Sequence, residues 1–579
     1  MDNYFVSSCK RVKDWICRQF GQKEKKTVHH KKLADGGEVI VWETGRAGEE
    51  AASYENLFLR KEIAGFRTNI RREQSCSIKS LTRDYLYKQL LSSGEYTFDH
   101  MLVIKDPYGE APLTALALFM LEEPACVRVT TKGNLEVTDF VTELPKKKEH
   151  RVPILGMYAE KANDIVIEIL DDEGNCVKSH TFTIRTKRLP KSLRNVITVK
   201  KWTDKPAYSN IMINGGVKIH TCVFDIEGKI RYYLSRKPRG YGIFPLSDGH
   251  FFYMEKYISV PSYSNPQTVE SYDMDYFGRV FRTYLTEKGV HHTAEEKAGG
   301  NILTGSNSML EHTEDCVIEI DRQTGEIVWQ LNMAEIFDET YQNMMDWCHV
   351  NSAAYYEKDR TILISLRNVH AVICVDYDTK KLRWILSDPK FWEGTKMTPY
   401  LLQPEGDVKW CYQQHAAFEI ALPDESNSQK KRIIVYDNHW AKRRKAKSFD
   451  KDPLSYVSFY DIDEEKKTVS LHKRFAGPKT RIRANGIYVP DKKRVYNMAG
   501  SYAEPVDGDG GGIFEYDYET GEVLSEFGVK PGFFRAYPFE PNVQELAEPM
   551  QVTGDYQVGQ IKQPQEISSS KYCKLKSEK

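Results

Sequence analysis

The sequence predicts an all-β protein, a six-bladed β-propeller preceded by an Ig-like β-sandwich and a partly helical N-terminal extension. Three observations lead to this prediction. Aromatic residues make up 12% of the 579 residues, 34 of them tyrosines, and turn residues are frequent, which favours strands over helices. Short alternating strands fill one stretch of about a hundred residues. A strand-turn-strand unit then recurs six times further along the chain.

The N-terminal extension, residues 1–95, is mixed and partly basic. Ser80 to Leu91 has the apolar spacing of an amphipathic helix that begins at a serine cap. His29 and His30 lie among lysines, which disfavour metal binding, so a solvated, flexible segment is the simpler interpretation. We find no chemistry in this part of the chain.

Residues 96–190 read as the β-sandwich domain. Their short strands alternate polar and apolar residues and are separated by Pro and Gly turns, and about a hundred residues is the size of one such domain. The turn at Asp106 to Gly109 predicts an edge rather than a site. We expect this domain to pack against its neighbour, to cap it or to dimerise, so a homodimer is one possible assembly.

Residues 191–540 carry the repeat that predicts the propeller. Each unit is a strand that ends in aspartate, a short turn and a second strand, and the successive aspartates lie 50, 46, 55, 87 and 54 residues apart. A period near fifty with several short strands per unit is typical of propeller blades. The six aspartates are Asp225, Asp275, Asp321, Asp376, Asp463 and Asp517. The longest gap holds a basic insert at 437–452, a solvated loop, and residues 541–579 form a polar tail.

Composition limits the partners and the compartment. Lys plus Arg and Asp plus Glu are both 82, so no net charge predicts nucleic acid or a membrane as a partner. The 11 cysteines are scattered without zinc-like spacing, as expected for reduced cysteines. No signal peptide and no run of about 18 apolar residues is visible. We therefore expect the cytoplasm, with periplasmic location or export by another route as the alternative.

The stretch from Asp346 to Arg367 is the first candidate site. His349 and Asn351 are two residues apart, so on an extended backbone both side chains leave the same face and can donate toward one point. Arg367 follows a return strand at residues 361–366. Neutral and cationic donors of this kind suit an anion with several oxygens, such as sulfate or phosphate. The alternative is a loop histidine with local polar contacts, oriented by Asp346.

Further histidines occupy matching places ahead of other repeats. His291 and His292 precede one blade strand, and His415 precedes another, by intervals similar to that of His349. A lone histidine is more often structural than catalytic. Three at one blade position are more readily explained by a shared site, because a propeller brings equivalent positions to its central channel.

These residues belong to motifs that resemble the bacterial aryl-sulfate sulfotransferase family. The similar segments are DWCHVNS with SLR downstream, QQHAA, VHH followed by GGNIL, DPYGEAPLTAL and HRVPILGMY. The resemblance runs from about Tyr96 to Phe539. It implies an N-terminal β-sandwich on a six-bladed propeller, and a reaction that moves a sulfuryl group from a phenolic sulfate ester to a phenol with no nucleotide donor, cofactor or metal.

The resemblance also implies a role for each candidate residue. His415 matches the family's nucleophile, which would give a ping-pong reaction through a sulfohistidine. Arg367, His349, Asn351 and His291 or His292 would hold the sulfuryl oxygens. Spacing to the following strand selects His291, whereas a shift of one residue selects His292. A protonated histidine could pass the proton between the two phenols, and the sequence does not identify which one.

Other classes of protein fit less well. A type I sulfatase needs a CxPxR-type motif, which none of the cysteines has. A quinone-dependent dehydrogenase-like propeller is suggested by IVWQL and LRWIL, but only two of the six repeats carry the tryptophan. A non-enzymatic propeller that serves as an interaction scaffold is the main alternative, and it would leave the histidines unexplained.

Overall fold

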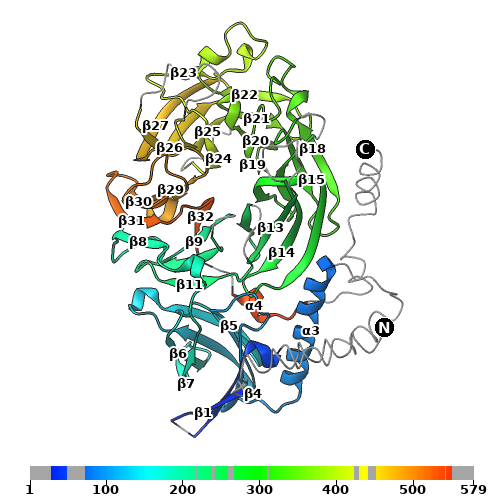
Figure 1. The fold of residues 1–579 in the computed structure, drawn as a ribbon, viewed down its shortest axis with the longest axis vertical. Coiled ribbons are helices and arrows are strands. Elements are labelled where there is room, and N and C mark those ends of the chain that lie inside the picture. The colour runs from blue at the N-terminus through cyan, green and yellow to red at the C-terminus, as the bar shows by residue number, and fades with distance from the viewer. Residues whose placement is uncertain are drawn as a thin grey trace, which may run out of the picture.

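The structure, a computed structural model, describes residues 28–34, 36–47, 72–216, 219–236, 241–258, 267–308, 312–422, 429–440, 452–540 and 543–550. Most of the 437–452 insert, much of the N-terminal extension and the tail after Met550 lie outside these residues. The described chain is mainly sheet (Figure 1). The helix predicted at Ser80 to Leu91 is confirmed as part of α3 (Arg72–Ser92), but its predicted start is wrong, because Ser80 lies inside the helix and does not cap it. Within the described ranges, no helix is long and apolar enough to cross a membrane.

A seven-stranded sheet forms the first domain, at the bottom of Figure 1. Its order is β1-β2-β3-β4-β6-β7, with β5 paired to β4. Its strands are β1 (Val28–Lys32), β2 (Glu38–Trp42), β3 (His100–Lys105), β4 (Ala115–Thr131), β5 (Phe140–Ile154), β6 (Ala162–Leu170) and β7 (Cys176–Arg185). Two of these strands, β1 and β2, come from the N-terminal stretch that we predicted as an extension, and β2 pairs with β3 in parallel. The flexible segment predicted around His29 and His30 is wrong, because both residues lie in β1 and pair with β2.

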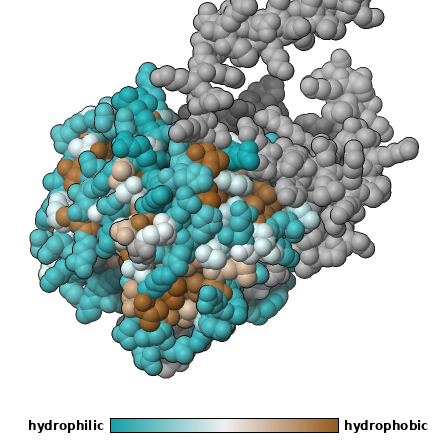
Figure 2. Space-filling model, turned by 90° about the horizontal axis from the view of Figure 1, so that it is seen from below, coloured by the Kyte–Doolittle hydropathy of each residue, from teal (hydrophilic) through white to brown (hydrophobic). Residues whose placement is uncertain are grey.

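The sheet folds over on itself at β4. The first half of β4 pairs with β3 and the second half with β6, and the register shifts between Met120 and Ala125. An irregularity of this kind bends a strand. The ring of Phe98, before β3, then stacks on His180 of β7 with centroids 4.4 Å apart. The two halves thus face each other across one core, as in a sandwich. The outer face, seen from below in Figure 2, is mostly hydrophilic, with scattered apolar patches.

The remaining strands form five sheets in a propeller-like ring. The sheets are β11-β10-β9-β32, β12 to β18 in sequence, β19 to β22 in sequence, β23-β27-β26-β25-β24, and β28-β29-β30-β31-β8. The seven-stranded member is continuous through the long strand β15, whose first part pairs with β14 and whose last part pairs with β16. Counting β15 in two blades gives six units, in line with the six repeats.

The strands of the ring have the following bounds. They are β8 (Ile197–Lys201), β9 (Asn210–Asn214), β10 (Cys222–Asp225), β11 (Ile230–Tyr233), β12 (Gly242–Pro245), β13 (His250–Ile258), β14 (Gln267–Asp275), β15 (Val280–Glu296), β16 (Ile302–Ser306), β17 (Cys316–Ile320), β18 (Ile327–Asn332), β19 (Val350–Tyr356), β20 (Thr361–Leu366), β21 (Ala371–Asp376), β22 (Leu382–Leu386), β23 (Gln403–Pro404), β24 (His415–Ile420), β25 (Lys430–Asp437), β26 (Leu454–Asp463), β27 (Thr468–Pro478), β28 (Asn485–Val489), β29 (Arg494–Ala499), β30 (Gly511–Asp517), β31 (Val523–Val529) and β32 (Arg535–Pro538). The short helix α4 (Gln544–Ala547) follows β32.

The repeated aspartates have a structural role. Each carboxylate accepts a hydrogen bond from a backbone N–H three or four residues further on, at N···O distances of 2.8 to 3.0 Å. An aspartate that bonds to the backbone of its own turn fixes that turn. The repeated aspartate therefore marks the hairpin between two strands of each unit. This hairpin does not lie at the start of the unit's innermost strand.

The ring closes between the two ends of the propeller segment. The last strand, β32, pairs with β9, and β8 pairs with β31, so strands from the start and the end of this segment share two sheets. Hydrogen bonds from a buried arginine of the ring fix the first domain to it. Arg231 donates to the carbonyl oxygens of Gly156 and Thr138, both at 2.7 Å, and its Nη1 lies 3.2 Å from an Asp225 oxygen.

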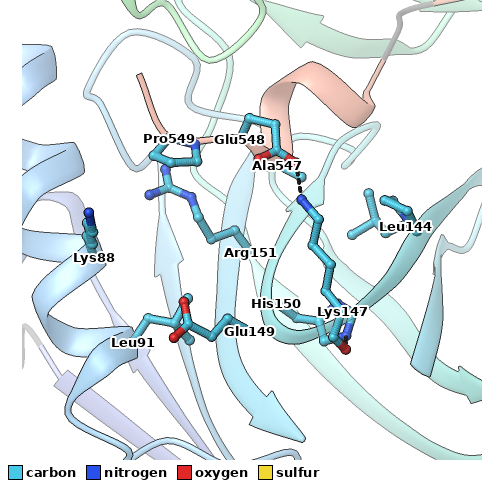
Figure 3. Close-up of a pocket in the computed structure, with 11 residues that line it drawn as sticks. Lys88, Leu91, Leu144, Lys147, Glu149, His150, Arg151, Ala547, Glu548 and Pro549 are labelled. Atoms are coloured by element: carbon cyan, nitrogen blue, oxygen red, sulfur yellow. Dashed lines mark hydrogen bonds and ion pairs between the residues drawn. The ribbon is translucent and has the colours of Figure 1, made fainter. Parts of the chain in front are cut away.

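A second buried network joins α3, β5 and the turn before β15. Asp84 lies 2.5 Å from Nη2 of Arg151 and 3.4 Å from Nη1 of Arg279, and it accepts from the backbone N–H of Met550 at 2.6 Å. A cavity of about 260 Å³ adjoins this network, between α3, β5 and the segment after α4 (Figure 3). None of the residues that line it is a predicted site residue.

Candidate functional site

The candidate site is built where innermost strands of neighbouring units begin. His292 in β15, His349 before β19 and Ala416 in β24 have positive φ angles of 58°, 58° and 65°. At each of these places the register with the next strand shifts. Bulges re-aim side chains and are frequent beside functional sites. Residues separated by long stretches of chain are thereby turned toward one another.

The structure brings together three of the predicted histidines. The ring of His292 lies 4.7 Å from that of His349 and 6.0 Å from that of His415, between centroids. All three side chains are buried, with exposures of 6%, 8% and 2%. His291 lies behind His292, so it is His292 that faces the other two rings.

His349 is held as a cation. Its Nδ1 lies 2.9 Å from an Asp346 oxygen and 2.5 Å from an oxygen of Glu314. Burial alone would lower the pKa of this imidazole, but the two carboxylates outweigh burial and raise the pKa to about 9. Nδ1–H is directed at the carboxylates, so Nε2–H is the donor that His349 can offer to a substrate.

His415 is neutral in the same cluster. Burial, together with the positive charge of Arg535, keeps its pKa well below the ordinary value. Nδ1 lies 2.8 Å from the carbonyl oxygen of Ala484, so Nδ1 carries the proton and donates it. The lone pair of a neutral imidazole then resides on Nε2.

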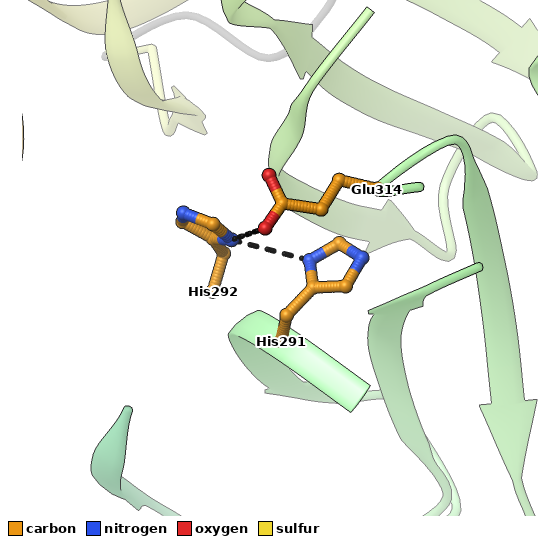
Figure 4. Close-up of side chains that lie close together, drawn as sticks. All are labelled: His291, His292 and Glu314. Carbon is orange, nitrogen blue, oxygen red and sulfur yellow. Dashed lines mark hydrogen bonds and ion pairs between the residues drawn. The ribbon is translucent and has the colours of Figure 1, made fainter. Parts of the chain in front are cut away.

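A chain of hydrogen bonds fixes the tautomers of the double histidine (Figure 4). His291 donates from Nε2 to the carbonyl oxygen of Ser306 at 2.8 Å, which places the lone pair of its neutral ring on Nδ1. Nδ1 of His292 lies 3.2 Å from that atom and therefore donates to it. Burial keeps the pKa of His292 well below its usual value, so His292 presents an unprotonated Nε2. His291 thus orients His292.

Asn351 and Arg367 hold the backbone around the histidines. Asn351 donates from Nδ2 to the carbonyl oxygen of Gln414 at 2.8 Å, next to His415 in the chain. Arg367 lies after β20 as predicted, and its backbone N–H donates to the carbonyl oxygen of His349 at 3.1 Å. Its guanidinium donates to Asn368 Oδ1 at 3.1 Å, and its positive charge acts on His415.

Several residues of the site escaped sequence reasoning. Arg535 is 1% exposed and donates to the carbonyl oxygen of Asn351 at 2.8 Å. Two aromatic rings adjoin the histidines: Phe534 lies 5.7 Å from His415 and Tyr241 lies 4.4 Å from His292, between centroids. Arg483 precedes β28, the place in its unit that the histidines occupy in theirs, and this position is the signal that could have found it.

Two groups of buried side chains could hold a metal ion. They are His291, His292 and Glu314, and Glu314, Asp346 and His349, with ligand atoms within 4.8 Å of one another. Both groups share Glu314, whose Oε1 lies 3.8 Å from Nδ1 of His292. A cation at the second group would displace the proton that His349 shares with its carboxylates, so metal and proton compete for one place.

Comparisons with known proteins identify related proteins over most of the chain. A family model described as arylsulfotransferase matches residues 195–535, and one described as the arylsulfotransferase Ig-like domain matches residues 102–187. Two curated proteins called arylsulfate sulfotransferase AssT are similar. The protein from Escherichia coli O6:H1 is 23% identical over 566 residues, and that from Lelliottia amnigena is 22% identical over 563 residues. Each match covers 74% of this chain and 90% of the relative.

A solved structure is also similar in part. It is a protein of unknown function from Bacteroides caccae, 11% identical, with a TM-score of 0.37, and the match covers 57% of this chain and 98% of that one.

Proposed function

Because the chain belongs to the arylsulfotransferase family, we propose that it moves a sulfuryl group from an aryl sulfate to a phenol, with His415 carrying the group in between. The observation that carries this proposal is the protonation pattern of the site. A neutral imidazole with its lone pair on Nε2 lies among fixed cations, and this is the arrangement that a nitrogen nucleophile needs in order to attack an anionic ester.

In the first half of the reaction, Nε2 of His415 attacks the sulfur of the donor. The N–S bond forms as the bond between sulfur and the aryl oxygen breaks, and the electron pair leaves with that oxygen. His349, cationic below a pH of about 9, gives its Nε2 proton to the departing oxygen, so the first product leaves as a phenol. The enzyme is left as a sulfohistidine with a neutral His349.

In the second half, the same steps run in reverse with a new phenol. The neutral His349 takes the proton of the acceptor phenol. The phenol oxygen attacks the sulfur at the same time, and the N–S bond breaks. The electron pair of that bond returns to Nε2 of His415. Both partners regain their starting charge, so the cycle needs no further reagent and is ping-pong in form.

The charge of the sulfuryl oxygens is balanced by groups that are fixed before the substrate binds. Arg367, His349 and Arg535 supply positive charge around His415. Donors held rigidly in a buried site stabilise developing charge at little reorganisation cost. Asn351 acts through the backbone that it ties to Gln414, and His292 offers a second unprotonated nitrogen.

The test is release of 4-nitrophenol from 4-nitrophenyl sulfate, followed with and without phenol. We expect release that depends on phenol and is lost in His415→Ala, while His472→Ala, which changes a part-exposed histidine on β27, retains it. Mass spectrometry after exposure to donor alone should find one sulfuryl group on the peptide that holds His415. Release at the same rate into water, or sulfation of another residue, contradicts the proposal.

A further inference from the structure

Arg483 is a cation of this region whose guanidinium has no carboxylate partner among the described residues. Its side chain is half-buried, Nη1 is fully buried, and no hydrogen bond or ion pair to its guanidinium exists among the described residues. Burial lowers the pKa of this guanidinium, as expected for a charge taken out of water without a partner. Leaving a buried charge unpaired costs free energy, so an anion that binds to such a group is favoured.

Other buried arginines show what a satisfied guanidinium looks like in this protein. Arg231 lies 3.2 Å from Asp225, Arg279 lies 2.5 Å from Asp275, and Arg322 lies 2.9 Å from Asp273. Each of these guanidinium groups lies beside a carboxylate of the same chain. Arg483 departs from this pattern.

The backbone of Arg483 is fixed beside the nucleophile. Its φ angle is 66°, its carbonyl oxygen accepts from Asn438 at 3.2 Å, and the next residue, Ala484, binds Nδ1 of His415. Two hydrogen bonds thus hold this stretch of backbone beside His415, and the side chain of Arg483 leaves the chain there.

The guanidinium lies on the Tyr241 side of the histidines. Arg483 is among the charges that affect the pKa of Tyr241, whereas the cations with the largest effects on His415 are Arg535, His349 and Arg367. The rings of Tyr241 and Phe534 lie 5.2 Å apart and flank His292 and His415. An aryl group whose sulfuryl end reaches His415 and whose ring meets these two rings extends toward Arg483.

Charge balance separates the role of Arg483 from that of the other cations. The transferred sulfuryl group carries one negative charge and already faces three cations. A fourth, with no acid beside it, matches a second negative charge on the substrate. We propose that Arg483 binds a carboxylate that the phenol carries on a short side chain of its aromatic ring, so that the preferred acceptors are carboxylated phenols. This inference rests on the proposed sulfuryl transfer and specifies its substrate class. Guanidinium and carboxylate are matched in shape as well as in charge.

The experiment compares acceptors that share a 4-hydroxyphenyl group and differ in the charge of the side chain, with 4-nitrophenyl sulfate as donor. The acceptors are 4-hydroxyphenylacetate, its neutral methyl ester, and the cationic tyramine. For the wild type we expect kcat/KM to favour the carboxylate over the ester by about tenfold, the usual worth of one charge-assisted hydrogen bond. Arg483→Ala should abolish that preference, mainly through KM, and Arg483→Glu should transfer it to tyramine.

Arg481→Ala is the matched control, since Arg481 lies two residues away, is exposed and pairs with Glu504 at 3.2 Å. It should keep the wild-type preference. Equal kcat/KM for the carboxylate and the ester in the wild type overturns the inference, a result that needs no variant. A fall in kcat by the same factor for every acceptor in Arg483→Ala also overturns it, because Arg483 would then serve the sulfuryl group. Failure of the wild type to sulfate any acceptor refutes the proposed function itself.

Discussion

The charge on His349 offers the sharpest test of the acid-base assignment. The pKa of about 9 stands about 2.5 units above the ordinary value of 6.5, which corresponds to roughly 3 kcal/mol in favour of the cation. Two carboxylates, Asp346 and Glu314, produce this shift against the opposing effect of burial. Replacing Asp346 by Asn removes one of them, so we expect the pKa of His349 to fall by at least about one unit.

The assay is single-turnover sulfation of the enzyme by phenyl sulfate between pH 5.5 and 10.5. Phenolate is a poor leaving group, so the rate should fall as His349 loses its proton, near pH 9 in the wild type and at least about one unit lower in Asp346→Asn. With 4-nitrophenyl sulfate, whose leaving group needs less help, the fall should be shallow in both proteins. Asp376→Asn makes the same change at the end of β21, in the sheet that Asp346 precedes, and should leave the profile unmoved. An identical profile in Asp346→Asn and the wild type would refute the reasoning.

Three further predictions follow from buried contacts. The pKa of His349 is raised on folding, so its ion pairs stabilise the fold fully below about pH 6.5, and this stabilisation is lost as the pH rises through about 9. Urea unfolding of the wild type at different pH values should show this loss of stability. An equal loss in His349→Asn would contradict the prediction. Gly305→Ala would place a Cβ 2.5 Å from Cε1 of His291, so we expect a loss of about 1–3 kcal/mol in unfolding free energy and slower transfer, unlike Gly45→Ala, where nothing lies within 4 Å. Arg231→Met would leave the carboxylate of Asp225 buried without its partner, so we expect the free energy of unfolding in urea to fall by about 3–5 kcal/mol. Arg128 is more exposed, and Arg128→Met should lower it by about 1 kcal/mol or less. Similar losses in the two variants would argue against a buried pair.

Local patterns carried most of the fold prediction. The six repeated aspartates could be found because each bonds within its own turn, so its role is complete within four residues of sequence. The membership of β1 and β2 in the first sheet could not be found in this way. Pairing of β2 with β3 joins strands more than fifty residues apart, and alternation within a strand does not identify its neighbour.

The site was only partly visible for a related reason. His349 and His415 stand at equivalent places in the sequence, and the structure brings their rings to His292. Choosing His292 over His291 depends on a bulge, since a shift of one residue turns a side chain to the opposite face. Arg535 and Glu314 were missed because their closeness to the histidines arises from ring closure and loop packing, which no spacing in the sequence records.

The place of Arg535 in the last strand of the ring has a consequence for biosynthesis. A ribosome makes His292, His349 and His415 well before β32, which pairs with β9 from the start of the propeller segment. Until β32 emerges and docks, the growing protein holds His415 without Arg535 and without Phe534 beside it. Assembly of the histidine cluster with Arg535 and closure of the ring of sheets are thus one event, and a polypeptide released before residue 535 is an open ring with an unfinished site.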